Sequence, residues 1–203
     1  MGQQRLRRAV QAYENDESQQ VPLSIEWKPF QIDLSTDMQG EDMEAYCRRR
    51  WGSSGWTNHL KQEGRKDGAS FRNWKWWPNT LRGHQWIQYG VQRHNLKSDD
   101  LNARLFTALY EEGANLSSVQ TLIKLGQELF PECNEEELRA YLSDNQGAVE
   151  VHREIQAGRR QFQIQGVPFF VVSRNGEPFT TFSGAQSSGY LKSILREAAT
   201  EED

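Results

Sequence analysis

The residues best suited to chemistry are two cysteines and four histidines. Cys47 and Cys133 lie far apart in the sequence, and neither belongs to a C-x-x-C pair. Dithiol exchange needs a thiolate of lowered pKa beside a second thiol that resolves the mixed disulfide. We therefore expect two free, partly buried thiols, with a single disulfide between them as the alternative. No metal-ligand spacing connects the histidines, so no metal site is expected at His59, His84, His94 or His152.

Two polar residues, Asn79 and His84, stand at the start of a segment with strong helical periodicity. Apolar residues recur there every three or four positions, which predicts an amphipathic helix over residues 79–95. Asparagine commonly caps helices, so Asn79 is explained without a function. His84 falls on the apolar face, where a histidine with satisfied hydrogen bonds is the first interpretation. A general base is the alternative, although no nucleophile can be named beside it.

A proline at the start of an apolar run is the most informative local feature near the C-terminus. Gly166-Val167-Pro168-Phe169-Phe170 opens this run. Proline cannot donate to a β-ladder, so it belongs at the first residue of a strand or on an edge. Because only ~5% of X-Pro bonds are cis, an ordinary trans proline is the interpretation that these residues support by themselves.

The elements that must position these residues follow from changes in hydrophobic period. A helix, a strand, a helical block, a hairpin and a final helix are predicted over residues 1–13, 21–32, 40–163, 167–182 and 187–199. Asn175-Gly176 marks the hairpin turn, because this pair readily takes left-handed conformations. The simplest arrangement is one small mixed sheet built from both chain ends, with the helical block inserted between them.

Composition excludes several classes of protein. The 203 residues carry a net charge of −4 and a pI near 5.7, so nucleic acid and anionic membranes are not expected as partners. No apolar run approaches the ~20 residues that cross a bilayer. The basic N-terminus lacks the apolar core of a secretory signal, so a cytoplasmic protein is expected.

The tryptophans form a notable cluster in the sequence. All seven lie between Trp27 and Trp86, interleaved with basic residues. Such a surface could bind single-stranded nucleic acid, but the acidic remainder of the chain favours aromatics that hold the helical block together. A third interpretation is that an exposed subset lines a groove for apolar peptides.

Four motifs, in order and in approximate spacing, resemble the FrnE-type, DsbA-like oxidoreductases of the thioredoxin superfamily. Their relatives include the glutathione-dependent 2-hydroxychromene-2-carboxylate isomerases. The resemblance covers about residues 2–199 and rests on Trp27-Lys28-Pro29-Phe30, Asn79-Thr80 with His84, Gly166-Val167-Pro168-Phe169-Phe170 and Ser183-Gly184-Ala185-Gln186. Gly83 departs from the family pattern, which has alanine there, and a glycine inside a helix costs ~1 kcal/mol.

The resemblance implies an α/β protein with a thioredoxin-like fold and a large all-helical insertion. On this basis residues 1–39 and 164–203 form a discontinuous thioredoxin-like domain, and residues 40–163 form the insertion. It further implies a cis Val167-Pro168 bond facing the active site, where the Val167 backbone pairs with an extended polypeptide or with glutathione. Asn79 and His84 are the other expected substrate-binding residues. No cofactor is expected apart from this use of glutathione, and the oligomeric state is left open.

The same resemblance exposes a departure at the N-terminus. Family members begin with a strand and a C-P-W-C-type motif, whereas Met1-Gly2-Gln3-Gln4-Arg5-Leu6 matches the residues that follow those cysteines. We therefore expect the first strand and the redox cysteines to be missing, as in an incomplete gene product. The predicted function is a thiol-disulfide oxidoreductase that is inactive in this form. The alternatives are a glutathione-dependent isomerase-like protein and a non-catalytic peptide-binding or chaperone-like module.

Overall fold

A computed structural model describes residues 1–16 and 21–200. The chain forms two compact units. Unit 1 comprises Met1–Ile25, Glu63–Ala69 and Gly158–Asp203, and unit 2 comprises Glu26–Gln62 and Ser70–Ala157. Among the described residues, no helix combines the length and apolar character needed to cross a membrane.

The elements follow one another along the chain largely as the hydrophobic periods predict. In order they are α1 (Gly2–Glu14), β1 (Glu41–Asp42), α2 (Met43–Trp51), α3 (Trp56–Lys66), β2 (Trp76–Trp77), α4 (Leu81–His94), α5 (Ser98–Tyr110), α6 (Val119–Leu129), α7 (Glu135–Ser143), α8 (Ala148–Phe162), β3 (Phe169–Arg174), β4 (Glu177–Ser183) and α9 (Ser188–Ala199). The helices predicted from the sequence are confirmed to within a few residues at their ends.

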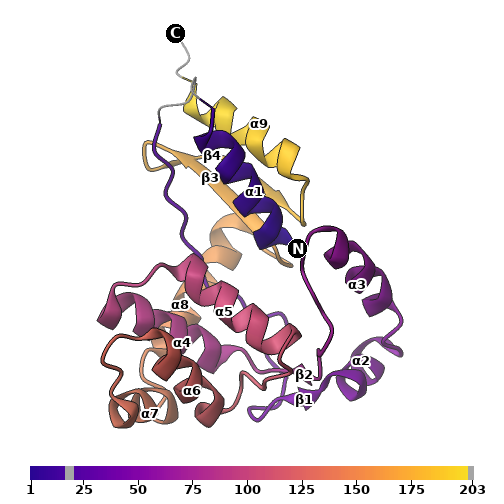
Figure 1. Ribbon diagram of the computed structural model, residues 1–203, viewed down its shortest axis with the longest axis vertical. Helices are drawn as coiled ribbons and strands as arrows, with labels where there is room; N and C mark the ends of the chain where they lie inside the picture. The colour runs from indigo at the N-terminus through magenta and orange to yellow at the C-terminus, as the bar shows by residue number, and fades with distance from the viewer. Residues whose placement is uncertain (17–20, 201–203) are drawn as a thin grey trace. The chain divides into compact units, whose positions relative to one another are not determined.

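Unit 1 is built on a β-hairpin and two helices. Strands β3 and β4 pair antiparallel from Phe169 opposite Ser183 to Arg174 opposite Glu177. The predicted turn is confirmed, because Asn175 and Gly176 both take positive φ angles, 52° and 87°. Helices α1 and α9 lie side by side, and α9 also contacts β3 (Figure 1).

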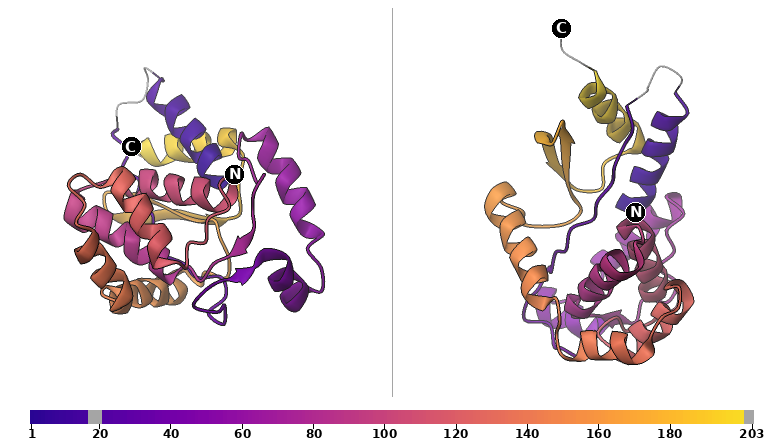
Figure 2. Two further views of the ribbon diagram at one scale, coloured as in Figure 1. Left: turned by 60° about the horizontal axis from the view of Figure 1, so that its bottom comes forward. Right: turned by 90° about the vertical axis from the view of Figure 1, so that its left-hand side faces the viewer.

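Unit 2 is almost entirely helical (Figure 2). Its core lies among α2, α4, α5, α6 and α7. Helix α4 contacts α5, α6 and α7. The largest fully buried side chain is Trp86 on α4. Two-residue strands β1 and β2 pair antiparallel inside the block predicted to be all helical. All seven tryptophans belong to this unit, so tryptophan fluorescence reports on unit 2.

The strand predicted over residues 21–32 is wrong. This segment is extended but forms no ladder with any described strand. Side chains from helix starts bind its second half instead: the Trp27 N–H donates to Ser98 Oγ at 3.1 Å, and the Trp27 indole N–H donates to Asp99 at 2.8 Å. Alternating side chains arise in any extended chain, whereas a strand also needs a partner for its backbone.

The predicted domain boundaries at 39/40 and 163/164 stay a prediction. The two compact units group residues that contact one another. The predicted boundaries instead mark a segment inserted into the family's fold, so the units do not test them. Residues 17–20 and 201–203 of the predicted thioredoxin-like domain lie outside the described residues.

Two glycines of unit 2 allow a test of how closely the chain before α8 packs against α4 and α7. Gly147, immediately before α8, has φ +76°, and an added Cβ would lie 2.0 Å from Gln88 Oε1 and 2.3 Å from Tyr141 Oη. Gly52, at the C-terminus of α2, has φ +78° with nothing within 4 Å of such an atom. Gly52→Ala should cost ~1–2 kcal/mol of unfolding free energy from the left-handed backbone alone. Gly147→Ala should cost a further ~1 kcal/mol, because the Gln88 side chain must move away and lose the hydrogen bond that it accepts from Tyr141. Urea unfolding followed by tryptophan fluorescence measures both, and equal losses would contradict the crowding at Gly147.

Candidate functional site

A pocket of about 490 Å³ lies in unit 1 where strand β3 begins. The Val167-Pro168 peptide bond there is cis, which confirms what the resemblance implied. Val167 is exposed and Pro168 is half-buried. The residues that line the pocket are Gln163, Gln165, Gly166, Val167, Pro168, Phe169, Ser183 and Gly184.

The loop after β4 forms the second wall of this pocket. The Gly184 N–H donates to the Pro168 carbonyl at 2.8 Å, and the Gln186 side chain donates to the Ser183 carbonyl at 2.7 Å. Gly184 has φ +83°, a backbone conformation that favours glycine. The Ser183-Gly184-Ala185-Gln186 motif therefore turns the chain beside Pro168.

The start of α1 packs against the same proline. A Cβ atom on Gly2 would lie 3.0 Å from Pro168 Cγ, which is tighter than an ordinary contact. Residue 2 must therefore be small for helix α1 to begin this close to the pocket.

Arg5 joins three parts of unit 1. Its guanidinium donates to the Ala185 carbonyl at 2.5 Å and to Asp67 Oδ2 at 2.7 Å. Arg8, one turn later, lies 3.6 Å from the other Asp67 oxygen, and the Asp67 side chain is only 7% exposed. A buried carboxylate needs such partners, because burial of an unpaired charge is costly. These contacts hold α1, residues 63–69 and the loop after β4 together.

Neither Arg5 nor Asp67 was predicted as part of the site. The available signal was the spacing of Arg5 and Arg8, which places both on one face of a helix. Nothing in the sequence around Asp67 indicates that it accepts both arginines. Sixty-two positions separate it from Arg5.

Val167 presents an unused stretch of backbone at the pocket. Between described residues, no hydrogen bond involves its N–H or carbonyl, and ladder pairing with β4 begins only at Phe169. Its side chain is 48% exposed. An exposed, unpaired backbone beside a strand can accept an extended chain.

Asn79 and His84, the other predicted site residues, belong to unit 2, whereas Val167 and Pro168 belong to unit 1. Asn79 lies one residue before Thr80, the N-cap of α4, and its side-chain oxygen accepts from the N–H of Leu81, the first helical residue, at 3.1 Å. Its nitrogen donates to the Thr36 carbonyl at 2.9 Å, and its own N–H donates to Ser117 Oγ at 2.8 Å. Thr80 rather than the predicted Asn79 is therefore the N-cap residue, although Asn79 still binds the helix start. Substrate binding by Asn79 stays a prediction.

His84 contacts the extended segment that precedes it. Its Nε2 lies 3.1 Å from the Phe30 carbonyl, so this nitrogen carries the proton and donates. Burial lowers the pKa of the imidazole to about 4, while the hydrogen bond to Phe30 raises it by a smaller amount. The ring is therefore neutral at pH 7, and its substrate-binding role also stays a prediction.

The two thiols belong to unit 2 and do not line the pocket at Pro168. Both are free, as expected. Burial raises the pKa of the Cys47 thiol, and burial together with Glu135 and Glu137 raises that of Cys133. Both shifts disfavour the thiolate that thiol exchange requires. Among the described residues there is also no group of three or more side chains able to hold a metal ion.

The sequence matches a known protein family over almost its full length. A family model described as the DSBA-like thioredoxin domain matches residues 1–196. The chain belongs to this DsbA-like family. A search of curated proteins by sequence finds no match.

A solved structure confirms the fold of this DsbA-like chain. The crystal structure of a probable DsbA oxidoreductase from Streptomyces coelicolor superimposes with a TM-score of 0.80 at 19% sequence identity. The similarity covers 97% of this chain and 82% of that one. At this identity the likeness establishes the fold alone, which is the thioredoxin-like α/β class predicted from the motifs.

His84 makes unit 2 sensitive to acid. Its folded-state pKa of about 4 lies below the ordinary 6.5, so the unfolded chain binds the proton more readily. Stability is therefore fully present above pH 6.5 and is lost as the pH falls toward 4. Lowering the pH from 7 to 4.5 reduces the unfolding free energy of the parent chain. In His84→Gln this reduction should be smaller by about 2 kcal/mol. Urea unfolding at the two pH values, followed by tryptophan fluorescence, measures the difference.

The difference between the parent chain and His84→Gln is due to His84, because all other acid-sensitive groups are present in both. One is Asp33, whose pKa is lowered mainly by the Ser35 hydroxyl. An unchanged acid loss in His84→Gln would show that the imidazole is not buried in its neutral form.

Proposed function

We propose that this DsbA-like chain is an oxidoreductase-type protein that binds an extended polypeptide at the Pro168 pocket. The observation that carries the proposal is the unpaired Val167 backbone at the mouth of that pocket, in a chain whose family match spans residues 1–196. A bound chain would pair with the Val167 N–H and carbonyl as an added strand does.

The pocket lining supports a polypeptide with an apolar side chain near the point of pairing. Val167 and Phe169 supply apolar surface, and Gly166 and Gly184 leave room for a second backbone. Main-chain pairing recognises any extended sequence, so selectivity would come from the neighbouring side chain. Glutathione, itself a short peptide thiol, is the small ligand that we propose for the same edge.

The redox step needs a thiol that these residues do not supply. The 203 residues contain no C-x-x-C pair, and the pKa values of Cys47 and Cys133 are raised rather than lowered. We therefore propose that the chain in this form binds polypeptide but does not exchange disulfides by itself. The glutathione-dependent isomerase-like function is an alternative, for which glutathione binding is the required observation.

Insulin reduction by dithiothreitol tests the absence of exchange. The purified chain should give the same rate as dithiothreitol alone, because thiols of raised pKa supply little thiolate at neutral pH. The Cys47→Ala/Cys133→Ala double variant is the control and should give that same rate.

Two results would contradict this part of the proposal. Turnover above the background that survives in the double variant would require a nucleophile other than the two cysteines. Turnover that disappears in the double variant would show that one of these thiols is active despite its burial.

Binding of a fluorescein-labelled apolar peptide tests the polypeptide site. The peptide should bind the parent chain, and N-methylation of its central amides should weaken binding about tenfold, because it removes the N–H that donates to the Val167 carbonyl. Val167→Asp should also weaken binding, because it places a carboxylate in an apolar contact. Val149→Asp is the matched control, since Val149 is 83% exposed and lies in unit 2. Fluorescence anisotropy measures all four cases, and equal affinity for both peptides would exclude backbone pairing.

A further inference from the structure

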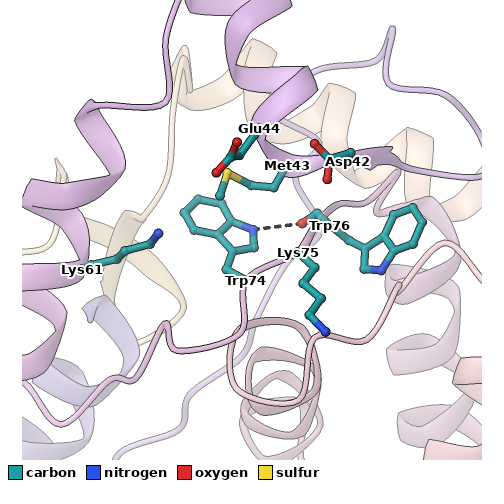
Figure 3. Close-up of a pocket in the computed structure, with 7 residues that line it drawn as sticks. All are labelled: Asp42, Met43, Glu44, Lys61, Trp74, Lys75 and Trp76. Atoms are coloured by element: carbon teal, nitrogen blue, oxygen red, sulfur yellow. Dashed lines mark hydrogen bonds between the residues drawn. The ribbon is translucent and has the colours of Figure 1, made fainter.

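A second pocket lies wholly within unit 2, beside the start of α2 (Figure 3). It has a volume of about 390 Å³, at the lower end of the range of ~300–1,000 Å³ for small-molecule sites. The end of β1, helices α2 and α3 and the segment that carries β2 supply its lining. It consists of Asp42, Met43, Glu44, Lys61, Trp74, Lys75 and Trp76. We call it the Trp74 pocket.

The floor of the Trp74 pocket is apolar and firmly held. Trp74 is 7% exposed and Met43 is 5% exposed. The Trp74 indole N–H already donates to the Trp76 carbonyl at 2.9 Å, and the Met43 N–H donates to the Lys75 carbonyl at 2.9 Å. The floor therefore offers an apolar surface rather than hydrogen-bond donors, which suits an apolar side chain.

Neither lysine ammonium group of this pocket, on Lys61 or on Lys75, makes an ion pair or a hydrogen bond within the described part of the chain. Lys61 is half-buried on α3, and Figure 3 shows its side chain directed toward the Trp74 indole. An ammonium without an ion-pair partner beside an apolar surface favours an anionic ligand group.

The two carboxylates of the pocket are only weakly engaged. Asp42 accepts the Ala45 N–H at 2.9 Å as the cap of α2. Glu44 lies 3.6 Å from Arg48, and both side chains are more than 60% exposed, so this pair contributes little. No ion pair joins either carboxylate to Lys61 or Lys75, although all four groups line one pocket.

This distribution of charge selects the kind of ligand. A simple anion would meet Asp42 and Glu44, and a simple cation would meet Lys61 and Lys75. We propose that the Trp74 pocket binds a short zwitterionic peptide, with its carboxylate at Lys61, its ammonium at Glu44 and an apolar side chain on Trp74. Such a ligand satisfies both signs of charge and the apolar floor together. The site needs no thiol and is independent of the function proposed for the Pro168 pocket.

The test uses the dipeptide Ala-Phe and three blocked forms of it, measured by calorimetry on the whole chain. Ala-Phe should bind, because it carries both charges and an aromatic side chain. Acetyl-Ala-Phe lacks the ammonium and Ala-Phe-amide lacks the carboxylate, and each should bind about tenfold more weakly. The doubly blocked form should be weaker still.

Two variants assign each end of the ligand. Lys61→Met should weaken Ala-Phe about tenfold but leave Ala-Phe-amide unchanged, because that ligand has no carboxylate to lose. Glu44→Gln should weaken Ala-Phe but leave acetyl-Ala-Phe unchanged. Lys124→Met is the matched control, since Lys124 is an exposed lysine on α6 outside the pocket, and it should bind Ala-Phe as the parent chain does.

Several outcomes would overturn the proposal. One is absence of binding of Ala-Phe at millimolar concentration, and another is equal affinity for Ala-Phe and the doubly blocked form. A third is equal loss of Ala-Phe and Ala-Phe-amide in Lys61→Met. The parent tryptophan fluorescence spectrum and urea midpoint confirm that each variant is folded, so that lost binding is not lost structure.

Discussion

The need of every extended backbone segment for hydrogen-bond partners shapes both units of this protein. Residues 169–183 meet it by forming a hairpin, and Trp27 meets it through the side chain of Ser98. The Asn79 amide similarly binds the Thr36 carbonyl. Just before β3, the exposed Val167 has no partner between described residues for its N–H or its carbonyl. The proposed polypeptide site is therefore a place where this requirement is left for a ligand to satisfy.

The charged side chains around Asp67 in unit 1 are paired, whereas those at the Trp74 pocket of unit 2 form few ion pairs among the described residues. In unit 1 the nearly buried Asp67 is fully engaged by Arg5 and Arg8, and Arg5 also binds the loop beside Pro168. Because these charged groups bind one another and the backbone, they have few hydrogen-bonding positions left for a ligand. In the Trp74 pocket of unit 2, Lys61 makes no ion pair within the described chain, and Glu44 has only a weak one. Charges left apart around an apolar floor are what a ligand of mixed charge can bind.

The two thiols of this chain are not suited to thiol-disulfide exchange. The polypeptide site proposed at Val167 relies on backbone groups, whereas exchange of a disulfide requires an accessible thiolate. Burial raises the pKa of Cys47 and of Cys133, and neither lines the Pro168 pocket. The proposed binding at Val167 requires neither thiol, so binding and disulfide exchange can be measured separately.

The sequence by itself determined the helices, the Asn175-Gly176 turn and the thioredoxin-like class, because period, turn chemistry and motif order are local properties of the chain. The resemblance also predicted the cis Val167-Pro168 bond correctly. Tertiary structure alone decided that residues 21–32 are not a strand, since a ladder needs a neighbour that no local pattern reveals. It alone brought Asp67 to Arg5 and placed Lys61 at Trp74. Such contacts join residues that are distant in sequence, so their geometry follows from packing rather than from spacing.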